Sequence, residues 1–182
     1  MKTFIFRLSL LLLGISVSTA AEIPSAQEIA NSAAAAAYYQ DQDGRALISM
    51  TITDTRGRER TRELVILRRD VGADLGDQQF YVYFKAPADV SETAFLVWKH
   101  PESDDDRWLY LPALDLVRRI AASDERTSFV GSHFFYEDVS GRSPLEDEHE
   151  LLEVTEHYYV LKSTPKDPKS VEFTYFKSWI HK

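Results

Sequence analysis

Cysteine is absent from the sequence, and basic residues are outnumbered by acidic ones. Without cysteine the chain has no disulfides, no cysteine-ligated zinc or iron–sulfur cluster, no thiol catalysis and no lipid-modified N-terminal cysteine. Its 21 Lys and Arg residues stand against 29 Asp and Glu residues, which gives a formal net charge of −8. Because a nucleic-acid backbone is bound by clustered positive charge, we expect no nucleic-acid partner.

Several sequence motifs of enzymes are also missing. The chain contains no GxxxxGK[ST] loop, no GxGxxG fingerprint and no G-x-S-x-G elbow. Its five histidines include no pair at the i, i+4 spacing of a helical metal site. We therefore predict that the chain is not an enzyme and has no catalytic residue, metal site or cofactor. A hydrolase ranks third, behind the two functions considered at the end of this section, because no nucleophile–base pair can be recognised.

The residues that are present suit one packed domain. The 182 residues are 44% hydrophobic and 12% aromatic, which is enough for a globular core. No internal repeat or linker indicates a second domain.

The N-terminal twenty residues have the pattern of a secretory signal peptide. Lys2 and Arg7 precede an apolar stretch at 8–17, and small residues lead to a cleavage site after Ala20. The stretch is too short for a stable membrane span, although an uncleaved anchor is the alternative. We expect residues 21–182 to form the mature domain in the periplasm, peripheral rather than integral at the membrane.

The mature chain reads as one helix followed by strands. Ser25 and Glu28 form a capping box, and an alanine run then predicts a helix over 25–40. Alternating or aromatic runs predict strands that are separated by turns and prolines. These strands cover residues 45–54, 58–69, 78–85, 93–99, 107–111, 150–163 and 170–180. The pattern favours a mainly β fold, a curved antiparallel sheet or barrel with the helix on one face.

Large apolar side chains occur on both faces of the central strands. One face can pack under the helix, while the other either completes a two-sided core or lines a cavity for an apolar ligand. The candidate cavity residues are Phe80, Val82, Phe84, Phe95, Val97, Leu109 and Leu111.

A basic stripe stands out on this acidic chain. It consists of Arg56, Arg58, Arg60 and Arg62. Alternation predicts that the last three share one strand face, with glutamates on the other. The stripe is either a charged edge hairpin that keeps the protein soluble or a docking surface for an acidic partner or lipid headgroups.

Residues 107–142 resemble the signature stretch of the outer-membrane lipoprotein-sorting (LolA-like) protein family. The family pattern is W-x-Y-L-P-A, then V-R-R-I, S-F-x-G-S-x-F and Y-E-D. Its matches here include Trp108, Tyr110, Pro112, Arg118, Arg119, Gly131, Ser132 and Asp138. We interpret this motif as structural, with Pro112 ending a strand, Gly131 allowing a tight loop and the two arginines pairing with acids of 128–138.

The resemblance implies an incomplete, strongly bent antiparallel β-barrel closed by helices. Such a fold implies a periplasmic carrier or chaperone that shields the acyl chains of lipids or lipoproteins during transport towards the outer membrane. Family members usually continue beyond the segment that ends here at Lys182, so we expect the last strands to be lacking. The alternative function is an accessory or sensing subunit of an inner-membrane transporter of the resistance-nodulation-division (RND) type, or of an envelope regulator.

Overall fold

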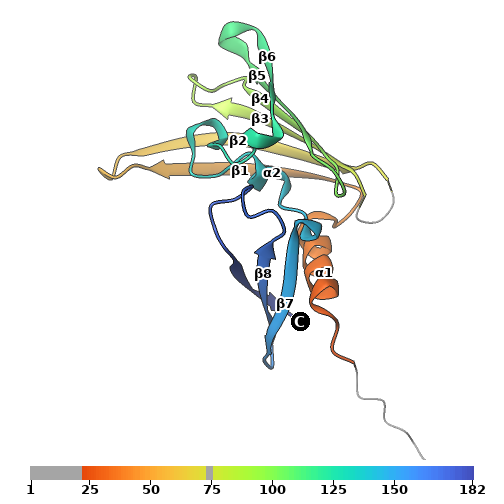
Figure 1. Ribbon diagram of the computed structural model, residues 1–182. Helices are drawn as coiled ribbons and strands as arrows, with labels where there is room; N and C mark the ends of the chain where they lie inside the picture. The colour runs from red at the N-terminus through yellow and green to blue at the C-terminus, as the bar shows by residue number, and fades with distance from the viewer. Residues whose placement is uncertain (1–21, 73–75) are drawn as a thin grey trace, which may run out of the picture.

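The computed structural model describes residues 22–72 and 76–182, which form two antiparallel sheets and an N-terminal helix (Figure 1). The predicted signal peptide lies outside these residues. The first sheet contains six strands in sequential order: β1 (Asp43–Thr53), β2 (Glu59–Asp70), β3 (Gln78–Ala86), β4 (Ala94–Lys99), β5 (Asp106–Leu111) and β6 (Leu116–Ile120). The second contains three: β7 (Asp147–Val154), β8 (Tyr158–Pro165) and β9 (Phe176–His181). The fold is therefore mainly β and antiparallel, as predicted.

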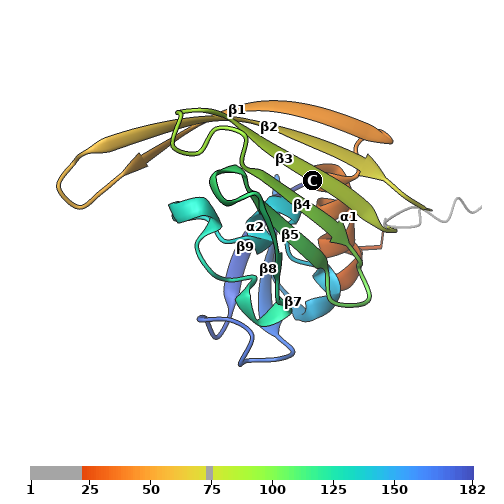
Figure 2. The same ribbon diagram turned by 90° about the horizontal axis from the view of Figure 1, so that it is seen from above.

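The six-stranded sheet bends over the rest of the molecule and does not close into a barrel (Figure 2). Its concave face receives the connection between the two sheets. This connection, residues 121–146, contains the short helical turns η2 (Ala122–Asp124), η3 (Phe129–Gly131), α2 (Glu137–Ser140) and η4 (Pro144–Glu146). A further turn, η1 (Pro112–Leu114), separates β5 from β6. The main core lies between the concave face and this connection.

The predicted N-terminal helix is confirmed as α1 (Ala26–Tyr38). Ser25 is its N-cap, and the capping box with Glu28 is formed. The helix packs mainly against β7 and β8, where Ile29 and Ala30 meet Leu161. It thus covers the three-stranded sheet, whereas the expectation had placed it on the central strands. The concave face of the larger sheet is covered by the 121–146 connection instead.

Three strand predictions require correction. The strand expected at 170–180 begins only at Phe176, the first residue of β9. Residues 150–163 were expected to form one strand, but the chain turns at 155–157 and gives β7 and β8. The turn contains no glycine or proline that would mark it in the sequence. It is closed by hydrogen bonds between Thr155 and Tyr158. Strand β6 was not predicted, because its V-R-R sequence is exposed and lacks the alternation of a half-buried strand.

Candidate functional site

The predicted cavity residues share the concave face of the six-stranded sheet. Val82, Phe84, Phe95 and Val97 have no exposed surface, and the side chain of Leu109 is also buried. The two remaining members of the set are Phe80, which is buried, and Leu111, which is partly buried against the same cluster. In this structure these side chains form packed core and do not line open space.

The space against them is filled by residues 127–140, which we call the plug. Phe129 and Tyr136 of the plug insert their rings towards Phe95, with ring centroids 5.4 and 5.0 Å away. Phe129 also lies 5.7 Å from Phe84. Aromatic pairs at these separations stabilise a core beyond their buried area. The concave face therefore has an aromatic cover that belongs to the same chain.

The plug has its own hydrogen-bonded framework. Val130 and Gly131 both have positive φ, 47° and 72°, and they turn the chain back on itself. Ser128 Oγ donates to the Ser132 carbonyl at 2.6 Å, and Ser132 Oγ accepts from the Phe134 amide at 3.1 Å. Gly131 therefore lies in a tight, hydrogen-bonded loop formed by the S-F-x-G-S-x-F segment.

The remaining motif residues lie in the plug and on strand β5. The Asp138 carboxylate accepts a hydrogen bond from the Phe135 amide at 2.7 Å. Pro112 directly follows the last residue of β5, as predicted, and begins η1. Trp108 and Tyr110 lie on the opposite, convex face of β5, because they alternate with the buried Leu109.

The expected pairing of Arg118 and Arg119 with acids of 128–138 is wrong. Arg118 pairs with Asp124 at 3.9 Å, and Arg119 pairs with Asp106. The two arginines are neighbours on β6, so they point to opposite faces and cannot both reach the plug. The acid of the plug that does form ion pairs, Glu137, is held by other arginines.

An apolar groove lies on the concave face beside the plug. It has a volume of about 430 Å³ and extends along the outer strands β1 and β2. Its apolar lining consists of Ile48, Met50, Leu64, Ile66, Phe129, Phe134 and Val139, with Ser49, Thr51 and Asp138 as polar members. Phe134 is 56% exposed at this groove, so a large aromatic side chain of the plug remains open to a ligand.

Only part of the predicted arginine stripe is on the surface. Arg56 and Arg58 lie in the turn before β2, and Arg58 pairs with Asp54 at 2.7 Å. Arg60 is exposed on β2. Arg62 is 7% exposed and donates to the Val130 carbonyl of the plug, so it is not part of a docking surface. Burial lowers the pKa of its guanidinium, while nearby Asp89 favours the charged form.

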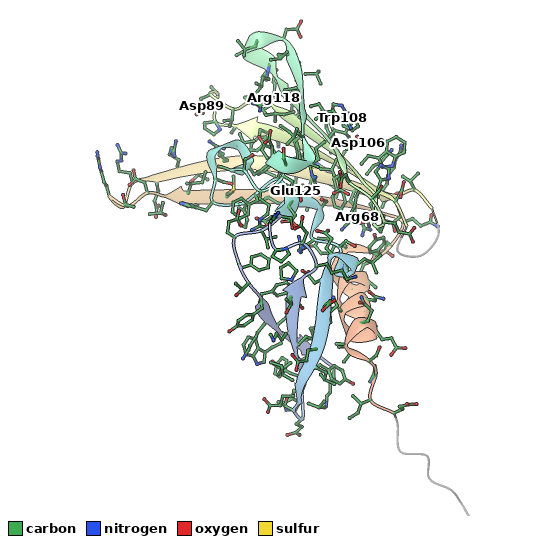
Figure 3. The ribbon with its side chains drawn as sticks, viewed as in Figure 1. Arg68, Asp89, Asp106, Trp108, Arg118 and Glu125 are labelled. Carbon is green, nitrogen blue, oxygen red and sulfur yellow. The ribbon has the colours of Figure 1, made fainter. Side chains whose placement is uncertain are left out.

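Buried ion pairs join the connection between the sheets to both of them. Arg107 pairs with Asp105 and Glu125, each at 2.8 Å, and Glu137 pairs with Arg126 and Arg142. Arg142 also reaches Asp147 at the start of β7 at 3.0 Å. Figure 3 shows Glu125 at this junction. Burial raises the pKa of the Glu125 carboxyl, although Arg107 opposes the shift.

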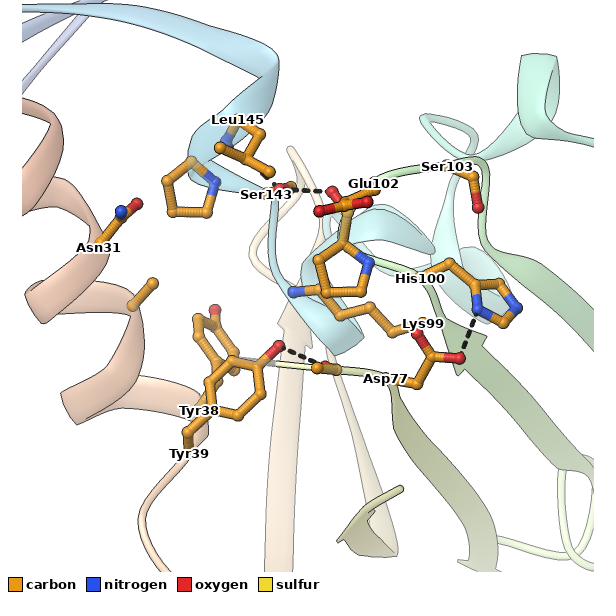
Figure 4. A pocket seen from close by; sticks show the side chains of 14 residues that line it. Asn31, Tyr38, Tyr39, Asp77, Lys99, His100, Glu102, Ser103, Ser143 and Leu145 are labelled. Carbon is orange, nitrogen blue, oxygen red and sulfur yellow. Dashed lines mark hydrogen bonds and ion pairs between the residues drawn. The ribbon is translucent and has the colours of Figure 1, made fainter. Parts of the chain in front are cut away.

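A polar cleft of about 460 Å³ opens between α1, the end of β4 and residues 143–145 (Figure 4). Lys99 donates to the Ser140 and Gly141 carbonyls, at 2.8 and 3.0 Å, and burial lowers the pKa of its ammonium group. His100 Nδ1 lies 2.8 Å from an oxygen of Asp77. These bonds hold the elements of the cleft together.

One histidine–serine pair was missed by sequence reasoning. His149 Nδ1 lies 2.8 Å from Ser163 Oγ, across the paired strands β7 and β8. Ser163 is 1% exposed, and His149 Nε2 lies 2.9 Å from the Pro144 carbonyl rather than a carboxylate. A buried hydroxyl cannot reach a substrate, so this pair fastens two strands. Within residues 22–72 and 76–182, no group of three or more potential metal ligands is found.

Comparison with solved structures identifies the family. A DUF1329 family protein from Desulfovibrio piger ATCC 29098 is 31% identical with a TM-score of 0.75, and the match covers 86% of this chain and 67% of that one. A domain from Vibrio parahaemolyticus, described as an outer membrane lipoprotein-sorting protein domain, is 30% identical with the same TM-score, and the match covers 86% and 66%. The chain belongs to the LolA-like family.

Three further comparisons concern the fold, a family model and the curated proteins. A LolA superfamily protein from Nitrosomonas europaea shares the fold, with 21% identity, a TM-score of 0.57 and coverage of 87% and 67%. A family model with the description "Uncharacterized protein" matches residues 76–182. No curated protein matches the sequence. The chain spans about two thirds of the length of its solved relatives.

Of the helices in the described part of the chain, none is long and apolar enough to cross a membrane.

Proposed function

We propose that this protein is a non-enzymatic periplasmic carrier that shields acyl chains of lipids or lipoproteins. The observation that carries the proposal is the apolar groove between the plug and strands β1 and β2. It lies on the concave face that the LolA-like fold encloses, and its chemistry suits a hydrocarbon chain. Burying such a chain contributes about 0.8 kcal/mol per CH2, so binding needs no cofactor and remains reversible.

The plug gives this carrier a way to adjust the size of its site. Its aromatic rings occupy the predicted cavity face, while Phe134 and Val139 line the open groove next to them. An acyl chain that enters beside Phe134 would extend inward as Phe129 withdraws. The seven predicted cavity residues would then contact the ligand in the loaded state.

The test is native mass spectrometry of protein recovered from a periplasm without detergent. We expect a mass excess that dissociates as lipid. Ile48→Glu places a carboxylate in the half-buried groove and should lower the loaded fraction by about tenfold, because an unpaired charge is costly to bury. Val97→Glu is less informative, since Val97 is fully buried and the charge would unfold the core.

Leu152→Glu is the matched control, because Leu152 is an exposed leucine on the three-stranded sheet. It should load lipid like the wild type. A folded wild type that is always free of lipid would refute the carrier function and favour the accessory subunit of an RND-type transporter. Equal loading of the Ile48→Glu protein would instead show that the groove is not the lipid site.

A further inference from the structure

The convex face of the six-stranded sheet is not covered by the other elements of the described chain. In Figure 2 the three-stranded sheet, α1 and α2 all lie beneath the concave face. The side chains of the convex face nevertheless include many large apolar residues. Contiguous exposed apolar surface of this kind marks a protein or membrane interaction site.

Two adjacent cross-strand rows make up this surface, which we call the outer band. Strand pairing places their members directly opposite one another, and each row crosses all six strands. The first row is Arg45, Leu67, Tyr81, Leu96, Trp108 and Arg119. The second row is Leu47, Val65, Tyr83, Ala94, Tyr110 and Val117.

The outer band is apolar in the middle and has arginines at its ends. Leu47 and Val117, at opposite ends of the second row, are 69% and 62% exposed. At one corner a shallow groove of about 470 Å³ is lined by Leu67, Tyr81 and Leu96 together with Arg45 and Arg69. A floor of apolar side chains beside guanidinium groups suits an amphiphile with an anionic head.

The corner groove carries an excess of positive charge. Arg69 Nε donates to Gln79 at 2.8 Å, which leaves its terminal nitrogens free of that bond. Arg45, Arg68 and Arg69 line the groove together with one acid, Asp43, which stands directly opposite Arg69 on the neighbouring strand. At the far end Arg119 and Asp106 form an ion pair and neutralise each other.

We propose that the outer band docks on a membrane surface that contains anionic lipid. Tyr and Trp side chains favour the bilayer interface, and arginines are attracted to anionic headgroups. Trp98 and Trp108 both lie on this face, since they alternate with buried residues of β4 and β5. The face also carries one exposed lysine, Lys85 of β3, and one exposed glutamate, Glu63 of β2. For a chain with a net charge of −8, an arginine-edged apolar face is the part that an anionic membrane would attract.

Vesicle co-sedimentation tests the proposal, using protein recovered from the periplasm. Binding should be stronger to phosphatidylcholine vesicles containing phosphatidylglycerol than to phosphatidylcholine alone. Leu96→Glu, at an exposed position in the centre of the band, should reduce binding about tenfold. Arg45→Glu should remove the preference for anionic vesicles. Leu152→Glu should bind vesicles like the wild type. All variants share the same N-terminal segment, so any contribution of that segment to vesicle binding is the same in every protein compared.

Tryptophan fluorescence reports on the face directly. The chain has three tryptophans, and Trp179→Phe leaves Trp98 and Trp108, both on the convex side. Brominated lipids should quench this variant when vesicles are added. The membrane assignment would be overturned if no quenching occurred, or if the Leu96→Glu protein bound vesicles as well as the wild type. It would also be overturned if the wild type were a dimer that Leu96→Glu converts to a monomer, because the outer band would then bind a second copy of the chain. Lipid loading of the groove is measured separately and can succeed or fail independently.

Discussion

Individual residues at the junction between the sheets show how tightly the connection is built. Gly141 follows α2 with φ of 75°, a conformation in which glycine has no steric penalty. A Cβ at this position would clash with the Tyr38 ring of α1, whose Cε2 would lie at 2.7 Å. The same ring lies 5.3 Å from the Lys99 ammonium. Glycine thus lets the end of α1 pack directly on the connection.

Gly141→Ala should lower the free energy of unfolding by about 3 kcal/mol, because it adds a clash to the strain of positive φ. Gly57→Ala is the matched control. Gly57 has the same φ of 75°, but a Cβ there meets nothing within 4 Å. Its cost should be about 1 kcal/mol. Urea unfolding measures both values, and equal losses would contradict the role of the Tyr38 contact.

At the scale of elements, the plug is held on the larger sheet by aromatic packing and by few polar contacts. Its own loop is closed by the Phe129 amide, which donates to the Phe134 carbonyl at 2.7 Å. Arg62 of β2 supplies a buried hydrogen bond to the Val130 carbonyl. Because hydrogen bonds to charged groups are stronger than neutral ones, this contact is a major restraint on the position of the plug.

Arg62→Met retains an apolar stem but removes the hydrogen bond to Val130. Loss of a charge-assisted bond of about 1.5–3 kcal/mol should speed local opening of the plug roughly tenfold or more. Amide hydrogen exchange of residues 128–136 measures this opening. Arg60→Met removes an exposed arginine from the same strand face and should leave the exchange unchanged. Unchanged exchange in both variants would show that Arg62 does not restrain the plug.

For the whole molecule, the ionic network joins two sheets that have separate apolar cores. Arg107 of β5 pairs with Glu125 of the connection, and Arg142 before η4 joins Glu137 of the plug to Asp147 of β7. Burial of Glu125 in this network disfavours the charged form of its carboxyl and raises its pKa. Stability of the complete fold should therefore depend on the protonation of the junction.

Glu125 makes this dependence testable. Burial raises its pKa in the folded state, so the unfolded chain loses the proton at a lower pH, near about 4.3. The contribution of Glu125 to stability is therefore largest below that pH and declines as pH rises towards the folded-state pKa. Urea unfolding of wild type and Glu125→Gln should show a stability difference, wild type minus variant, that falls between pH 4 and pH 7. A difference that rises with pH would contradict this assignment.

Most of the local structure could be predicted from the sequence. The capping box at Ser25, the alternation in β1 and β2 and the proline that follows β5 each act over a few residues. The concave set from Phe80 to Leu111 follows from the same period of two. Residues whose partners are distant were not predictable in this way. Arg62 was read as a surface charge, and its buried acceptor at Val130 lies 68 positions away.

The sequence by itself determined the strand and helix pattern, the face on which each central side chain lies and the family motif. These properties depend on neighbouring residues and on covalent geometry. The tertiary structure alone decided that α1 covers the smaller sheet, that the plug fills the predicted cavity face and that the outer band has no cover in the described chain. Each of these depends on how separate elements share apolar surface, and that choice is made only when the whole chain packs.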